Sequence, residues 1–117
     1  MWEMFLVGFI KQPLLPYLKN LQSCYRATGM GNVLGNKGGL QISFKIHEYL
    51  FNFINVHLIH GEKKFDKRNE MMSDLIRKMR HHREEIDPDI ISDFSFIIGD
   101  LNYRMDGTYD TLVPQIE

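Results

Sequence analysis

The sequence has little of what stabilises small secreted proteins or anchors proteins in membranes. It contains one cysteine, Cys24, so no disulfide can form within the chain, and a reducing compartment is the expected setting. No apolar run approaches the roughly 20 residues that a membrane-spanning helix needs. Residues 1–10 lack the basic start and the small-residue cleavage site of a signal peptide. These absences predict a cytoplasmic protein.

The chain also lacks an excess of charge of either sign. Its 14 Lys and Arg residues nearly balance its 15 Asp and Glu residues, which gives a formal net charge of −1. Neither the basic field of a duplex binder nor the acidic excess of a disordered chain is therefore expected, and any anion-binding surface must be local. The 117 residues, of which 44% are hydrophobic, suit one globular domain of modest size.

Apolar patterns predict a mixed α/β chain. Short apolar or alternating runs indicate strands at residues 4–10, 23–28, 40–46, 50–58 and 94–98, of which 4–10 and 94–98 are expected to be buried. The run 40–46 alternates, so Leu40, Ile42, Phe44 and Ile46 are expected on its buried face. Helical spacing of apolar residues predicts a helix over about 66–86, with Asp66 as its N-cap. Pro16 limits residues 13–18 to a short turn.

Five glycines within residues 29–39 form a loop that feeds the strand 40–46. The loop is not a Walker loop, because Asn36 separates Gly35 from Lys37 and no Ser or Thr follows the lysine. Two interpretations stay open at this point. The loop is either a tight connection between strands or a segment whose backbone approaches a ligand closely, with Lys37 as a cation at its edge.

Polar side chains follow two of the predicted strands, at the point where each strand ends. Asp100 and Asn102 lie two residues apart after the run 94–98, and Asn55 and His57 close the run 50–58. Residues two apart in an extended chain point to the same side. If the two strand ends lie side by side, all four groups share one cleft. The alternative is an ordinary turn at Asp100 and Asn102, since both residue types are common in turns.

Three stretches resemble, in order, motifs of one known family. They are residues 28–39, residues 55–58 with Gly61, Arg68 and Asn69, and residues 99–104, which read Gly-Asp-Leu-Asn-Tyr-Arg. The sequence resembles the inositol polyphosphate 5-phosphatases of the endonuclease/exonuclease/phosphatase superfamily, which is related to DNase I. The resemblance covers about residues 5–104.

The resemblance implies a fold of the α/β (α+β) class. It implies a DNase I-like, four-layer α/β/β/α sandwich, of which residues 1–117 would form a single partial catalytic domain without its N- and C-terminal portions. The implied reaction is Mg²⁺-dependent removal of the 5-phosphate from phosphoinositides, such as phosphatidylinositol 4,5-bisphosphate, or from soluble inositol polyphosphates.

The resemblance also implies roles for particular residues. Asp100 would orient or deprotonate the attacking water, and Asn102 and His57 would hold the scissile phosphate. Substrate-binding roles are implied for Lys37, Asn36, Arg104 and Asn55. No metal ligand is assigned, because the acidic ligand of the family is expected upstream of this chain.

The implied partners are a phosphoinositide headgroup or a soluble inositol polyphosphate, with peripheral contact at the cytosolic face of a membrane and no nucleic acid. Two other functions compete with this one. A DNase-like endonuclease on the same scaffold is disfavoured by the near-neutral charge. A non-catalytic module that binds phosphoinositides or a protein is favoured by the missing metal ligand.

Overall fold

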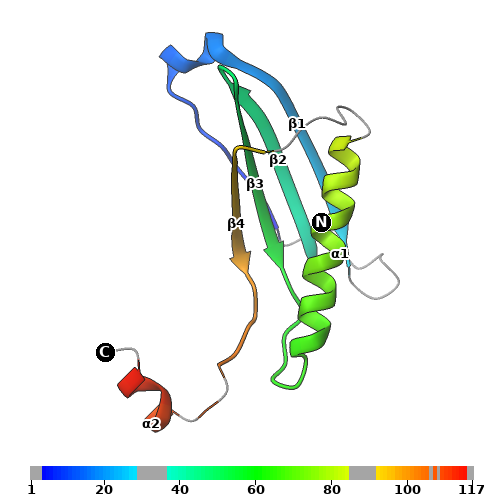
Figure 1. The fold of residues 1–117 in the computed structure, drawn as a ribbon, viewed down its shortest axis with the longest axis vertical. Helices are drawn as coiled ribbons and strands as arrows, with labels where there is room; N and C mark the ends of the chain where they lie inside the picture. Colours follow the sequence, from blue (N-terminus) through cyan, green and yellow to red (C-terminus); the bar gives the residue numbers. More distant parts are fainter. Residues whose placement is uncertain (1–3, 29–36, 85–91, 106, 108, 116–117) are drawn as a thin grey trace.

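The computed structural model describes residues 4–28, 37–84, 92–105, 107 and 109–115. In chain order its elements are η1 (Gln12–Tyr17), β1 (Leu18–Ala27), β2 (Gly38–Ile46), β3 (Tyr49–His57), α1 (Phe65–Glu84), β4 (Phe94–Asp100), α2 (Tyr109–Leu112) and η3 (Val113–Gln115). The strands form one sheet in the order β1-β2-β3-β4 (Figure 1). The chain is therefore a mixed α/β protein, as the sequence predicts.

The sheet combines two kinds of strand pairing. β1, β2 and β3 pair antiparallel, whereas β3 and β4 pair parallel. The turn between β2 and β3 is a two-residue hairpin, in which His47 has a φ of 53°, and a positive φ suits hairpins of this length. The parallel strands need a long connection, and α1 provides it (Figure 1).

Helix α1 packs on one face of the sheet, against β1 and β2. The core cluster of buried apolar residues comprises Ile54, Val56, Leu58, Leu75 and Met79. Burying side chains of this size stabilises a fold by about 1.5–3 kcal/mol each. The core therefore joins the helix to the end of β3, where the buried residues alternate with Asn55 and His57.

The predicted helix is confirmed, but its cap is not. α1 begins at Phe65, so Asp66 lies in the first turn instead of at the N-cap. An acidic side chain still interacts favourably with the helix dipole at that position.

The predicted buried face of β2 is wrong. Gln41 and Ser43 are buried, at 2% and 3% exposure, while Leu40 and Ile42 are half-buried. Gln41 lies in a polar chain across the sheet: its Nε2 donates to Asn52 Oδ1 at 2.6 Å, and its Oε1 accepts from Cys24 Sγ at 3.0 Å. Because these groups satisfy one another, burial of polar side chains is tolerated on this face.

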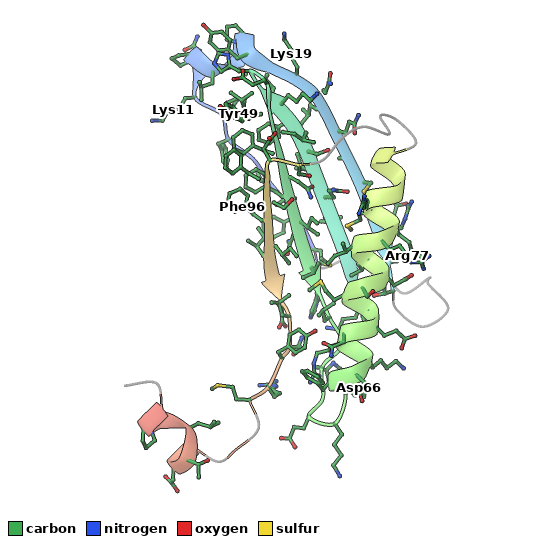
Figure 2. The ribbon with its side chains drawn as sticks, in the orientation of Figure 1. Lys11, Lys19, Tyr49, Asp66, Arg77 and Phe96 are labelled. Carbon is green, nitrogen blue, oxygen red and sulfur yellow. The ribbon has the colours of Figure 1, made fainter. Side chains whose placement is uncertain are left out.

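The opposite face of the sheet carries the aromatic side chains. The rings of Phe51 and Phe94 stack with centroids 5.0 Å apart, and those of Phe53 and Phe96 stack at 4.9 Å. Figure 2 shows the side chains along β3 and β4, with Phe96 labelled among them. Such pairs add about 0.5–1.5 kcal/mol beyond the area that they bury.

Residues 4–10 do not form the predicted buried strand. They have no regular structure, and Phe5, Val7 and Phe9 are exposed. The segment instead runs beside the aromatic face and lines a cavity of about 290 Å³ there, together with residues of β2, β3 and β4. Its apolar side chains line this cavity, but no described strand pairs with the segment.

Strand β4 is present but is not buried as predicted. All seven of its residues are exposed, because α1 lies over β1 and β2 and leaves β4 uncovered. Beyond β4 the chain leads to the short helix α2, which lies away from the sheet (Figure 1). Within the described part of the chain, no helix is both long and apolar enough to cross a membrane.

Candidate active site

The parallel pairing of β3 and β4 brings the two predicted polar strand ends together. In the strand register His57 lies opposite Asp100, and Asn55 lies opposite Ile98. Parallel strands end at the same edge of a sheet, so the imidazole and the carboxylate project from neighbouring positions. A backbone hydrogen bond also links the two strand ends at the residue after His57, where the Leu58 amide donates to the Asp100 carbonyl at 2.9 Å.

Gly99 allows β4 to approach β3 closely enough for this pairing. Its φ is 117°, a conformation that residues with a Cβ rarely adopt. A Cβ at this position would lie 2.1 Å from the Val56 carbonyl oxygen and 2.4 Å from Asn55 Oδ1. The glycine before Asp100 is therefore required by the backbone, whatever the carboxylate does.

Asn102 is held in a turn that faces the end of β3. Its backbone has a φ of 53°, and its amide donates to Asp100 Oδ1 at 3.0 Å. Its side-chain Nδ2 donates to the Leu58 carbonyl at 3.1 Å. Asn is one of the few residues that tolerate this backbone conformation. The turn interpretation and the site interpretation are thus compatible, since the turn itself places Asn102 beside Asp100.

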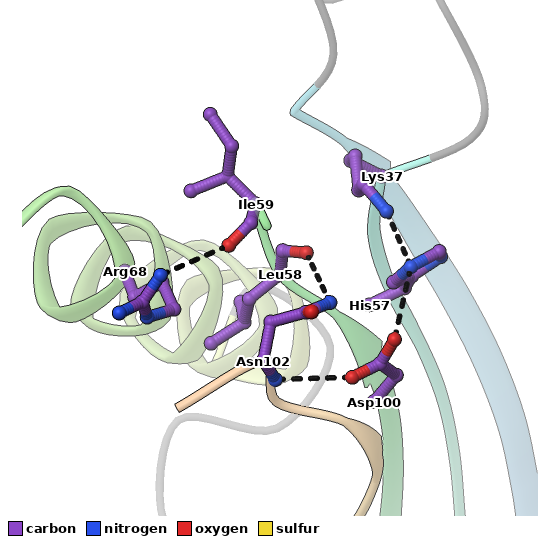
Figure 3. A network of polar contacts seen from close by, with 7 residues as sticks. All are labelled: Lys37, His57, Leu58, Ile59, Arg68, Asp100 and Asn102. Atoms are coloured by element: carbon purple, nitrogen blue, oxygen red, sulfur yellow. Dashed lines mark hydrogen bonds and ion pairs between the residues drawn. The ribbon is translucent and has the colours of Figure 1, made fainter. Parts of the chain in front are cut away.

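His57 lies between an acid and a base (Figure 3). Its Nε2 is 3.4 Å from Asp100 Oδ2 and also contacts Lys37 Nζ. Lys37 reaches it because Gly38, the next residue, pairs with His57 across β2 and β3. One ring nitrogen accepts from the ammonium when it carries no proton, and donates to the carboxylate when it does.

The exposure of these groups suits contact with a soluble ligand. The side chain of Asp100 is 61% exposed and that of His57 is 22% exposed. The Asp100 carboxylate accepts one backbone hydrogen bond and contacts His57, and its exposed oxygen surface can still accept a hydrogen bond from water. The cluster of Lys37, His57, Asp100 and Asn102 thus pairs a proton acceptor with several hydrogen-bond donors.

The other predicted substrate-binding residues lie elsewhere or outside the described part. Asn55 donates from Nδ2 to the Phe5 carbonyl at 2.8 Å. Arg104 is exposed and lines an open cavity of about 730 Å³ with residues that include His60 and Glu62. Asn36 lies outside the described residues. The substrate-binding roles of all three stay predictions.

Two residues outside the predicted catalytic and substrate-binding sets contribute to the architecture of the site. Tyr103 had no predicted role, and the family resemblance implied only a supporting role for Arg68. Arg68, in the first turns of α1, donates to carbonyls of the loop that follows β3, and Tyr103 follows Asn102 and packs on α1. Both lie in the stretches that carry the family resemblance. No periodic pattern, however, indicates that a helical arginine is turned inward.

The described residues do not by themselves fit a Mg²⁺ site. Across the described ranges there is no group of three or more His, Cys, Asp or Glu side chains that could hold a metal ion. Mg²⁺ needs near-octahedral oxygen coordination, usually with one or two carboxylates. Asp100 and Asn102 supply one carboxylate and one amide oxygen, so no chemical step is assigned to a metal.

Comparison with known protein families matches the entire chain to one of them. The family is described as "Endonuclease/Exonuclease/phosphatase family 2", and the match covers residues 1–117. The chain belongs to this family.

Curated relatives of this endonuclease/exonuclease/phosphatase family member include inositol phosphatases. Inositol-1,4,5-trisphosphate 5-phosphatase 1 of Schizosaccharomyces pombe is 34% identical over 113 residues, which are 95% of this chain and 10% of the relative. Phosphatidylinositol 3,4,5-trisphosphate 5-phosphatase 2A of Danio rerio is 32% identical over 109 residues, which are 91% of this chain and 9% of the relative. The chain thus spans about a tenth of the length of these two relatives.

A solved structure resembles this family member in fold as well. It is the inositol polyphosphate 5-phosphatase domain of SPsynaptojanin, in complex with inositol (1,4)-bisphosphate and a calcium ion. The TM-score is 0.59 at 28% sequence identity, and the match covers 90% of this chain and 30% of that chain. The predicted resemblance to the inositol polyphosphate 5-phosphatases is therefore confirmed.

Proposed function

We propose that this chain is part of a phosphatase that removes the 5-phosphate from inositol polyphosphates or phosphoinositides. The observation that carries the proposal is the pairing of His57 with Asp100 at the ends of β3 and β4, with Asn102 turned to the same edge. The names of the relatives support the substrate class, since they act on inositol trisphosphate or on a phosphatidylinositol trisphosphate.

In the proposed reaction Asp100 accepts a proton from the attacking water. The water oxygen forms a bond to phosphorus, and the bond from phosphorus to the inositol oxygen breaks. That oxygen leaves with the bonding electrons and takes up a proton from solvent water. The exposed Asp100 carboxylate has room for a water molecule. General-base assistance of this kind typically contributes about 10²–10⁴-fold to a rate.

The neighbouring donors stabilise the phosphoryl oxygens in this proposal. His57 donates from its imidazole, Asn102 from its amide, and Lys37 adds a positive charge beside His57. Preorganised donors of this kind stabilise charge that develops in the transition state. Arg104, Asn55 and Asn36 would contribute to substrate binding, as the family resemblance implies.

We further propose that the reaction needs Mg²⁺. Support comes from the family and from the solved relative, which holds a calcium ion. Because the described residues supply too few oxygen ligands, the metal would need others. When bound, such a cation neutralises negative charge on the phosphate. Loss of phosphate release on chelation, and recovery with Mg²⁺, would test this part of the proposal.

The proposed setting is the cytoplasm, with peripheral contact at the cytosolic face of a membrane when the substrate is a lipid. The single cysteine agrees with a reducing compartment. The net charge of −1 argues against strong adsorption to anionic lipids through the whole surface. Binding would then depend on the headgroup itself.

The proposal is tested by replacing Asp100 with Asn, which keeps the shape and removes the proton acceptor. We expect phosphate release from inositol 1,4,5-trisphosphate and from vesicles containing phosphatidylinositol 4,5-bisphosphate to fall at least about 100-fold. Asp110→Asn, in the exposed helix α2, is the matched control and should leave the rate unchanged. Equal rates for wild type and Asp100→Asn would refute the assignment.

Two further assays on the same protein distinguish the competing functions. Nicking of supercoiled plasmid with no release of phosphate would indicate an endonuclease. Calorimetric binding of inositol trisphosphate without turnover would indicate a binding module. Either result would contradict the proposed activity.

A further inference from the structure

Arg68 is the largest fully buried side chain of the described residues, at 1% exposure. Its Nη1 donates to the Ile59 carbonyl at 3.4 Å (Figure 3). The same Nη1 donates to the Gly61 carbonyl at 2.6 Å. Its Nε is buried and has no hydrogen-bond partner, and Arg68 makes no ion pair, among the residues described. Burying a charge without a carboxylate partner costs free energy, so the position of Arg68 calls for an explanation beyond packing.

Arg68 and Asn102 both donate hydrogen bonds to the loop of residues 58–61. Ile59 and Gly61 lie one and three residues after Leu58, whose carbonyl accepts from Asn102 Nδ2. The Leu58 amide in turn donates to the Asp100 carbonyl. Through the carbonyls of Ile59 and Gly61, the guanidinium therefore fixes the loop that begins at Leu58, to which Asn102 and Asp100 are both hydrogen-bonded.

Arg68 also contacts the segment after β4, through the ring of Tyr103. Its Cζ lies 5.5 Å from the centre of the Tyr103 ring, within the range of a cation–π interaction. The Tyr103 hydroxyl donates to Asn69 Oδ1 at 2.6 Å, and its ring meets Phe65 edge-on at 5.7 Å. Tyr103 is thus clamped on the first turns of α1 by three successive contacts.

The residue between these two attachments is the one with the unusual backbone. Asn102 has a φ of 53°, and a non-glycine residue keeps such a conformation only where its surroundings determine it. Leu58 fixes its side chain, and the clamp on Tyr103 fixes the residue that follows it. Arg68 is common to both constraints.

We propose that Arg68 is a positioning residue of the active site, which holds Asn102 and Asp100 in place through the 58–61 loop and the Tyr103 ring. Its effect on rate rests on the proposed phosphatase function, whereas its effect on the conformation of Asn102 does not. A merely structural arginine would stabilise the fold without controlling Asn102.

The kinetic test replaces Arg68 with Met, which keeps an unbranched stem and removes the donors and the charge. With soluble inositol trisphosphate as substrate, we expect kcat to fall about 10- to 100-fold at nearly unchanged KM, because small displacements of catalytic groups cost this much. Arg77→Met is the matched control, since Arg77 lies on the same helix and pairs with Asp74 at the surface. Equal kcat values for the two variants would contradict the proposal.

The conformational test needs no turnover. In ¹H–¹⁵N spectra of the labelled protein, the Asn102 backbone and side-chain amides report their bonds to Asp100 and Leu58. We expect Arg68→Met to shift both signals and Arg77→Met to shift neither. Shifted Asn102 signals in a protein that releases no phosphate would refute the phosphatase and leave Arg68 as the residue that positions Asn102.

A milder pair of variants keeps the proposal testable if Arg68→Met does not fold. Tyr103 is 37% exposed, so its replacement is tolerated more easily. Tyr103→Leu removes the ring from the guanidinium, whereas Tyr103→Phe keeps it and loses the bond to Asn69. We expect the larger Asn102 shifts and the lower kcat in Tyr103→Leu. Unchanged Asn102 signals in Tyr103→Leu would overturn the proposal.

Discussion

Gly99 decides whether the last residues of β4 reach the edge of β3. Its φ of 117° lies where a side chain is strained, and the space for a Cβ is already filled by the Val56 carbonyl. Two independent penalties, one conformational and one steric, therefore apply to any replacement. The backbone conformation and the packing at this position, and not the chemistry of Asp100, therefore require a glycine.

Replacing Gly99 with Ala should destabilise the protein. We expect the free energy of unfolding to fall by at least about 2 kcal/mol, because the strained backbone and the close contact must both be relieved. Urea denaturation followed by circular dichroism measures the change. Gly8→Ala is the control, since a Cβ at Gly8 would meet nothing within 4 Å. Equal midpoints for both variants would contradict the argument.

The residues that form the proposed site were predictable to different degrees. Asp100 and Asn102, like Asn55 and His57, show a local pattern, namely polar side chains two apart after an apolar run. Arg68 and Tyr103 show none, because their roles depend on which carbonyl or ring lies opposite in three dimensions. A local sequence pattern identifies the functional side chains of a segment. The residues that contact those side chains are determined by the three-dimensional fold.

At the scale of elements, α1 carries a charge cluster on its outer face. Asp74 pairs with Arg77 and with Lys78, with each nitrogen 2.6 Å from a carboxylate oxygen. The hydrogen bond from Lys78 is the main cause that lowers the pKa of Asp74 below its ordinary value of 3.8; partial burial opposes this shift, and the bond from Arg77 adds to it. Exposed pairs at this spacing are worth about 0.3–0.5 kcal/mol each.

This cluster predicts how the helix responds to acid. Since the folded pKa of Asp74 is lowered, its contribution to stability is present above pH 3.8 and is lost as the pH falls through the lower folded value. Wild type should therefore lose more stability than Asp74→Asn between pH 5 and about pH 2.5, as measured by thermal unfolding. An Asp74→Asn variant that lost as much stability as wild type over this range would contradict the argument.

Elements were predicted best where the pattern was long or regular. The helix over 66–86 and the hairpin of β2 and β3 were found within a few residues. The strand at 4–10 and the buried faces of β2 and β4 were wrong, because apolar periodicity says which side chains could be covered and not what covers them. The position of α1 over β1 and β2 decided the outcome.

At the scale of the whole molecule, the sheet formed by the described residues ends in an apolar strand. β4 is its edge, and the side chains of Phe94, Phe96 and Ile98 are about half exposed. Edge strands with unpaired backbone groups and apolar side chains favour association. The chain thus presents a surface that other polypeptide can cover.

We expect the isolated chain to associate as its concentration rises, which sedimentation velocity would detect. Phe94→Thr, which keeps a β-forming residue and removes the ring, should weaken this association. Phe9→Thr removes an equally large ring that is 96% exposed and lies outside the sheet. If Phe9→Thr weakened association as much as Phe94→Thr, general apolar exposure and not the β4 edge would be the cause.

The parallel pairing of β3 and β4 has a consequence for the order in which parts of the protein fold. The hairpin of β2 and β3 forms early, because the two strands are adjacent in sequence. His57 and Asp100 are separated in the sequence by the whole of α1. Contacts between distant parts of a chain slow folding. The pairing of His57 with Asp100 at the proposed site should therefore be among the last features to form during refolding, after helix α1 has formed.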